Sequence, residues 1–107
     1  MGFLRGFIEF ERIEQPHVPV EERVKSFCEI YGTLTDEQAK IQAGRCMDCG
    51  IPFCMHECPL HNDSPDFNEF VSEEQMSKAY NVLSATNNFP EITGRICPAL
   101  CEEGCTL

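Results

Sequence analysis

Apolar side chains recur along most of this chain at helical spacing, every three or four residues. In the first third, such a stripe predicts a helix over residues 20–31, with Gly32 as its C-terminal stop. The stripe consists of Val20, Val24, Phe27, Cys28 and Tyr31. Because Cys28 falls on this apolar face, we expect it to be a buried thiol.

Polar residues mark where the following helices begin. Thr35 and Gln38 have the spacing of a capping box, which predicts a helix over 36–47 that carries Cys46. Ser64 followed by Pro65 predicts an N-cap and the first position of a short helix that ends near residue 71.

A second capping-box pair, Ser72 and Gln75, predicts a helix over 73–86 with one apolar face. We expect one further turn at 90–93 and a short helix at 99–103. No segment alternates long enough to predict a strand. Residues 1–19, which contain Pro16 and Pro19, are expected to form an extended N-terminal arm before an almost entirely helical domain over 20–107.

Seven of the eight cysteines lie in two short runs, at 46–58 and 97–105. The first run reads C-x2-C-x4-C-x3-C-P, which follows the plan of two-cluster ferredoxins with a longer middle gap. In that plan, three cysteines bind one cluster and the fourth binds the other. A faint duplication indicates that the two runs are similar segments that close on each other. A Gly-Arg pair precedes each run, and each run contains a Cys-Pro pair.

Spacings of three and four residues place thiols on one face of a helix or turn. Gly50 and Gly104 are expected to let backbone approach closely and direct amide groups at sulfur. The crossed plan assigns one set of four thiols to cluster one and three thiols to cluster two. Cluster one takes Cys46, Cys49, Cys54 and Cys105, and cluster two takes Cys58, Cys97 and Cys101.

Several alternatives stay open at this stage. The fourth ligand of cluster two is Cys28, a non-cysteine side chain or a residue outside this chain. Zinc competes for the same thiols, which would make the chain a zinc-stabilised interaction domain without redox activity. Arg45 and Arg95 either offset the negative charge of the clusters or are ordinary surface arginines.

The charge and the hydropathy of the chain restrict which binding partners and which cellular compartment we expect. The formal net charge of −10 disfavours nucleic acid and anionic membranes. No apolar stretch is long enough to span a bilayer, and the N-terminus does not have the pattern of a secretory signal. We therefore expect a cytoplasmic protein, in which clustered cysteines bind metal rather than form disulfides.

Five stretches, spread from near the first residue to near the last, resemble the N-terminal iron–sulfur domain of the small (beta) subunit of NADPH-dependent glutamate synthase. The stretches are 6–12, 19–25, 42–54, 58–62 and 86–98. The cysteine motifs are also similar to those of dihydropyrimidine dehydrogenase. The resemblance implies an all-α, helical ferredoxin-type domain with two 4Fe–4S clusters, in which the fourth ligand of cluster two lies beyond the two runs.

The resemblance also implies a role in electron transfer for glutamate biosynthesis. In such proteins NADPH reduces an FAD in downstream domains, and electrons cross the clusters to the large subunit. This chain has no G-x-G-x-x-G fingerprint, so FAD and NADPH are expected only in domains outside it. The expected partners are therefore a flavin- and NADPH-binding domain or subunit and the glutamate synthase large subunit. No catalytic residue is expected in this chain.

Overall fold

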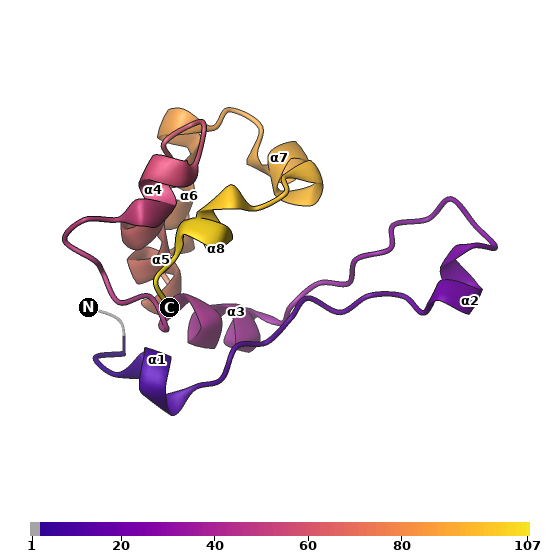
Figure 1. Cartoon of the computed structure of the whole chain (residues 1–107), viewed down its shortest axis with the longest axis horizontal. Helices are drawn as coiled ribbons and strands as arrows, with labels where there is room; N and C mark the ends of the chain where they lie inside the picture. The colour runs from indigo at the N-terminus through magenta and orange to yellow at the C-terminus, as the bar shows by residue number, and fades with distance from the viewer. Residues whose placement is uncertain (1–2) are drawn as a thin grey trace.

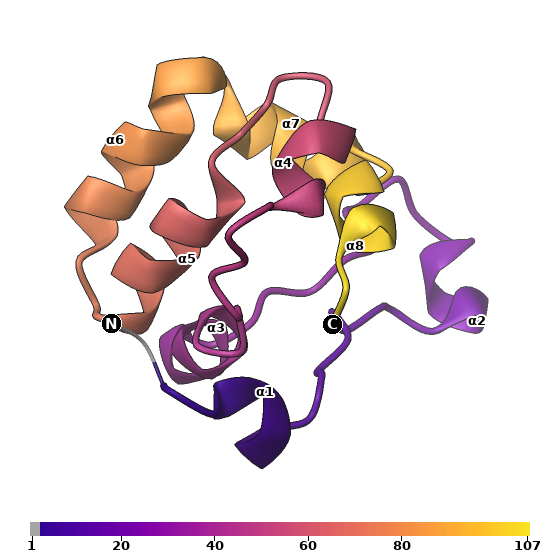
Figure 2. The same cartoon turned by 60° about the vertical axis from the view of Figure 1, so that its left-hand side comes forward.

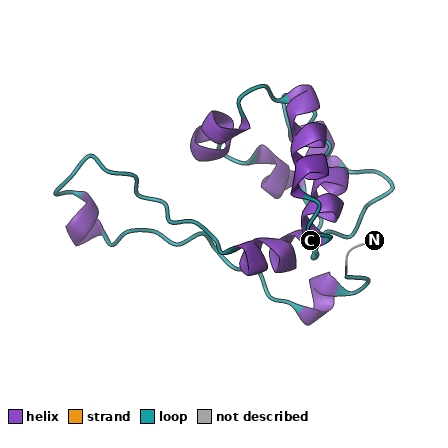
Figure 3. Ribbon diagram, turned by 180° about the vertical axis from the view of Figure 1, so that it is seen from behind, coloured by secondary structure: helices purple, strands orange, loops and turns teal. Residues whose placement is uncertain are grey.

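The computed structural model describes residues 3–107, and all regular structure in that range is helical (Figure 3). The helices are α1 (Gly6–Glu9), α2 (Val20–Arg23), α3 (Asp36–Ala43), α4 (Phe53–Glu57), α5 (Ser64–Ser72), α6 (Met76–Thr86), α7 (Pro90–Ile96) and α8 (Leu100–Gly104). Between residues 3 and 107 the structure has no strand, only an isolated bridge between His17 and Tyr31. The prediction of an all-α fold is confirmed.

Three helix pairs make up the body of the molecule. Helices α5 and α6 lie side by side as a hairpin, α3 packs against α5, and α4 packs against α8 (Figures 1 and 2). Helix α4 lies in the first cysteine run and α8 in the second. The two runs are separated by the 38 residues between Cys58 and Cys97. The fold therefore places the two runs against each other.

The helix starts follow the polar signals in part. The capping box of α3 is present: the Gln38 backbone N–H donates to the Thr35 hydroxyl at 3.2 Å, and the Thr35 N–H donates to the Gln38 side chain at 2.9 Å. Helix α3 ends at Ala43, however, so Cys46 lies in the loop after the helix and not within it. Helix α5 begins as expected, but its cap is Asp63, whose carboxylate accepts from the Asp66 N–H at 3.4 Å.

The prediction of a second capping box, at Ser72 and Gln75, is wrong. The Ser72 hydroxyl donates backward to the Glu69 carbonyl oxygen at 2.7 Å instead of capping a new helix. Glu74 then takes a left-handed backbone conformation, with φ of 61°, and α6 begins only at Met76. The tight connection between two packed helices thus overrides the local capping signal.

The helix predicted over 20–31 is also largely wrong, because only Val20–Arg23 is helical. The chain instead forms a long arm that leaves the body and returns, with α2 near its far end (Figure 1). Backbone bonds from Val18 N–H to Ile30 O (2.8 Å) and from Gly32 N–H to Pro16 O (2.7 Å) hold the two sides of the arm together.

The apolar stripe of this arm has no surface to cover. Phe27 and Val24 are exposed, and so is Cys28, which corrects the expectation of a buried thiol. A short helix in water is marginal unless its apolar face packs against something, because nucleation is unfavourable. The arm also explains the radius of gyration of 14.6 Å, larger than the roughly 13 Å typical of a compact chain of this size.

The N-terminal segment is fastened to α3 through Gln42. Its side chain accepts from the Ile13 N–H and donates to the Glu11 carbonyl, both at 3.0 Å. Nearby, Gly6 and Gly44 pack directly on each other: a Cβ on Gly6 would overlap the Gly44 carbonyl group. Two glycines thus allow α1 to lie against the end of α3, immediately before the first cysteine run.

Very little apolar material is buried. Among residues 3–107, the buried apolar side chains are Ala43, Pro65 and Ala79, and no large side chain is fully buried. Buried apolar area is the main stabilising term in most small domains. A chain with so little of it depends on other cross-links, and the cysteine runs are the obvious candidates.

Candidate metal centre

The seven clustered cysteines lie at helix ends and in the loops beside them. Cys46 and Cys49 follow α3, while Cys54 lies in α4 and Cys101 in α8. The remaining three are the residues that terminate a helix. These are Cys58 after α4, Cys97 after α7 and Cys105 after α8. None of the eight cysteines forms a disulfide.

Four cysteines from both runs surround one cavity of about 290 Å³. They are the four predicted for cluster one, Cys46, Cys49, Cys54 and Cys105, and Cys101 lines the same cavity. Phe53, Pro52, Phe67 and Leu107 complete much of its wall. At its edge, the Cys49 sulfur lies 3.9 Å from the Thr106 hydroxyl oxygen, which brings the end of the second run onto the first.

The electrostatics of Cys46 place it among its neighbours in the first run. Burial raises the pKa of the Cys46 thiol, while a hydrogen bond from the Asp48 backbone lowers it. Negative charge on Cys54 and Cys49 raises the Cys46 pKa further. These thiols are therefore close enough to oppose one another's ionisation, which a cation or cluster between them would relieve.

A second group of thiols forms around Cys101. Burial is the largest cause of its raised pKa, followed by the charge of Glu102 and then of Cys58 and Cys97. The three thiols predicted for cluster two thus lie near one another, although Cys58 belongs to the first run. Cys97 is exposed and also borders a broad groove beneath the arm.

The contact between α4 and α8 sets this arrangement. A Cβ on Gly104 would overlap the Glu57 side chain and lie 3.3 Å from the Phe53 carbonyl oxygen. The close approach expected at Gly104 is therefore present. At Gly50 the structure shows no such contact, because a Cβ there would meet no protein atom within 4 Å.

Two residues that the sequence did not indicate direct backbone amides at sulfur. Asp48 and Ala99 have left-handed φ angles of 49° and 58°, and each lies two positions after the first cysteine of its run. The Asp48 amide donates a hydrogen bond to Cys46 that lowers its pKa, and the Ala99 N–H lies 3.3 Å from the Cys97 sulfur. Aspartate is enriched in the left-handed conformation, but alanine is not. The only sequence signal for this conformation at both residues is their position, two residues after the first cysteine of each run.

Cys28 is not brought to either thiol group and lies in the arm. Within residues 3–107, no three side chains of His, Cys, Asp or Glu are arranged to hold a single metal ion. A zinc ion with Zn–S bonds of about 2.3 Å needs its sulfurs within about 4 Å of one another. A cubane cluster spreads its thiolate ligands further apart around its own volume.

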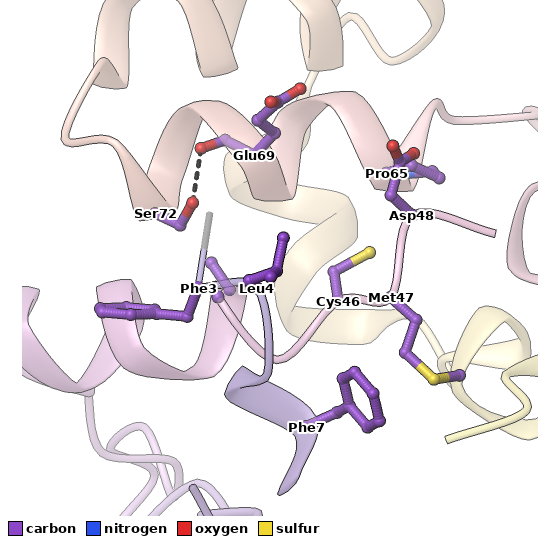
Figure 4. Close-up of a pocket in the computed structure, with 11 residues that line it drawn as sticks. Phe3, Leu4, Phe7, Cys46, Met47, Asp48, Pro65, Glu69 and Ser72 are labelled. Carbon is purple, nitrogen blue, oxygen red and sulfur yellow. Dashed lines mark hydrogen bonds between the residues drawn. The ribbon is translucent and has the colours of Figure 1, made fainter. Parts of the chain in front are cut away.

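A neighbouring cavity of about 230 Å³ lies on the other side of Cys46. Phe3, Leu4 and Phe7 of the N-terminal segment line it, and Figure 4 shows Leu4 and Phe7 near Cys46 and Met47, with the Phe3 ring directed away from them. The N-terminal segment therefore lies next to the first cysteine group and reduces the exposure of Cys46.

Thiols gathered from compact cysteine runs are typical ligands of iron–sulfur clusters. Residues 23–107 match the family described as dihydropyrimidine dehydrogenase domain II, 4Fe–4S cluster. This chain belongs to that family. The matched range contains all seven cysteines of the two runs.

Curated relatives extend the similarity to the N-terminal segment. The chain is 46% identical over 104 residues to the glutamate synthase (NADPH) small chain of Azospirillum brasilense and 41% identical over 103 residues to that of Escherichia coli. It is 47% identical over 105 residues to glutamate synthase (NADH) of Saccharomyces cerevisiae. These alignments cover 95%, 94% and 96% of this chain.

The same alignments cover much less of the relatives. The chain spans 22% of the length of each of these two small chains and 5% of the yeast protein. Among residues 3–107, no helix is long and apolar enough to cross a membrane.

Proposed function

We propose that this chain is an electron-transfer domain that carries two 4Fe–4S clusters. Cluster one would be held by Cys46, Cys49, Cys54 and Cys105. Cluster two would be held by Cys58, Cys97 and Cys101, with a fourth ligand from outside the two runs. In this proposal residues 1–19 form the N-terminal arm and residues 20–107 the two-cluster domain.

The observation that carries the proposal is the single cavity lined by all four thiols of cluster one. These residues span positions 46 to 105, yet they surround the same 290 Å³ space. A cavity bordered by several thiols and apolar side chains fits a group that binds thiolates and is shielded from water. Its lining therefore fits an iron–sulfur cluster better than a polar ligand.

The chemistry of the donors agrees with this fit. A 4Fe–4S cluster, when bound, accepts and releases single electrons at a potential set by its surroundings. The chain's own residues would hold the cluster through thiolates and exclude water through Phe53 and Phe67. The Asp48 and Ala99 amides would donate hydrogen bonds to ligand sulfur, which stabilises negative charge there.

We further propose that the domain serves a glutamate synthase. Support comes from relatives named as glutamate synthases that match almost the whole of this chain. In the proposed pathway, NADPH-reduced FAD in a separate domain or subunit supplies electrons, and the large subunit receives them. The net charge of −10 favours a partner face of positive potential.

Anaerobic reconstitution with iron and sulfide tests the proposal. We expect about eight irons and about eight labile sulfides per chain, with visible absorbance that dithionite bleaches. Stoichiometric zinc in a colourless chain would instead support a zinc-stabilised interaction domain. A chain that takes up neither iron nor sulfide would refute the two-cluster assignment.

A further inference from the structure

Arg45 lies beside the first cysteine group with an unusual lack of partners. Its Nε atom is buried and has no hydrogen-bond partner among residues 3–107. A buried N–H group without a partner loses its hydrogen bonds to water without replacement, and the cost is larger when the group is charged. Such atoms in a native structure point to a partner that the protein chain alone does not supply.

The cavity beside Arg45 indicates what that partner is. Arg45 lines the space that Cys46, Cys49, Cys54 and Cys105 surround, and among the described residues lining it, Arg45 is the only basic one. Glu102 also lines the cavity, but its carboxylate pairs with Arg12 at 2.7 Å. The guanidinium group of Arg45 therefore borders a space rich in thiols, and no acidic side chain among residues 3–107 forms an ion pair with it.

Arg95, the matching arginine before the second run, has a different environment. Its Nε atom donates to the Glu29 carboxylate at 2.6 Å, and a terminal nitrogen donates to the Glu91 carbonyl oxygen at 2.9 Å. Both arginines border the groove beneath the arm, but of the two only Arg45 also lines the cavity of the first group. Two arginines in equivalent sequence positions thus have different roles.

We propose that Arg45 is a tuning residue for cluster one, whose reduction potential it raises through its charge and its Nε–H group. This inference rests on the proposed binding of that cluster by the four thiols. One added electron makes the cluster and its thiolates more negative, and a nearby positive charge stabilises the reduced form more than the oxidised form. Arg95, already paired with Glu29, has no such effect on cluster one.

The test is a potentiometric titration of the cluster-loaded chain, followed by electron paramagnetic resonance. The signal altered by Cys49→Ser identifies cluster one. We expect Arg45→Gln to reduce the equilibrium constant for reduction of cluster one at least tenfold, a midpoint about 59 mV lower for a one-electron couple. Arg45→Lys, which keeps the charge, should remain within about threefold of the wild type, or about 28 mV.

Arg95→Gln is the matched control and should leave the cluster-one midpoint unchanged. An unchanged midpoint in Arg45→Gln, or an equal shift in Arg95→Gln, would overturn the inference. If Arg45→Gln does not load cluster one, uptake by Arg45→Lys supports the role of charge, and failure of both variants overturns it. Failure of the wild-type chain to bind clusters would refute the proposed function itself, so the two failures are distinguishable.

Discussion

Gly104 makes the contact between α4 and α8 possible, and replacing it with alanine should move the two cysteine runs apart. The added Cβ would overlap the Glu57 Cγ atom, lie 3.1 Å from the Glu57 Cβ atom and 3.3 Å from the Phe53 carbonyl oxygen. The far end of the Glu57 side chain can rotate away, but its Cβ and the backbone oxygen can move only if α4 shifts.

The magnitude follows from two opposing effects. Overpacking at a fixed contact destabilises by about 1–3 kcal/mol. Alanine in place of glycine in a helix stabilises by about 0.5–1 kcal/mol. Gly104 does not oppose this gain through its backbone, because no glycine in residues 3–107 has a positive φ angle. We therefore expect Gly104→Ala to lower the stability of the chain by about 1–2 kcal/mol.

The assay is guanidinium unfolding of the anaerobic, cluster-loaded chain, followed by loss of the helical circular dichroism signal. Because metal loss prevents a strict two-state analysis, midpoints of the variants are compared under identical conditions. Gly50→Ala is the matched control, since a Cβ at Gly50 meets nothing within 4 Å. A Gly104→Ala midpoint equal to that of the wild type or of Gly50→Ala would refute the packing argument.

Three further predictions follow from the same contacts. Cys105→Ser should lower the iron content of the reconstituted chain, whereas Cys28→Ser, in the exposed arm, should leave it unchanged; equal iron in both variants by metal analysis would contradict the cluster-one assignment. Burial raises the pKa of Cys46 and Cys101 above their ordinary value of 9.0, so the protonated thiols stabilise the metal-free fold below that pH. That contribution is lost as the pH rises through the folded pKa, so urea midpoints of the metal-free chain should fall above pH 9.0, and a constant midpoint would argue against burial of the thiols. Gln42→Ala should remove two hydrogen bonds to the N-terminal segment and speed amide exchange at Ile13, and unchanged protection there would show that the segment is held by other contacts.

Much of the helical body could be predicted from sequence because its signals are local. The capping box at Thr35 and Gln38 and the proline at the start of α5 act within a few residues, and both formed. The spacing of the cysteines likewise predicted that both runs meet, and cysteines of both runs line one cavity. The final turn of a helix is less local, and α3 ends before Cys46 for that reason.

The failures share one physical cause, which is that tertiary packing decides whether an apolar stripe is covered. Over residues 20–31 the periodicity is correct, but the arm stands away from the body and leaves Phe27 and Cys28 in water. At Ser72, the hairpin between α5 and α6 supplies a different acceptor for the hydroxyl group. The left-handed conformation of Ala99 has no signature in residue type at all.

Among residues 3–107, three ion pairs join segments that are distant in sequence: Arg12–Glu102, Lys40–Glu74 and Arg95–Glu29. All three are at least partly open to solvent, so dissolved salt weakens their attraction. The spacing of the thiols depends instead on the steric fit of α4 against α8, which salt does not screen. Ionic strength therefore acts on the N-terminal segment, on the arm and on the link from α3 to the α5–α6 connection, while the sulfur-lined centre keeps its geometry.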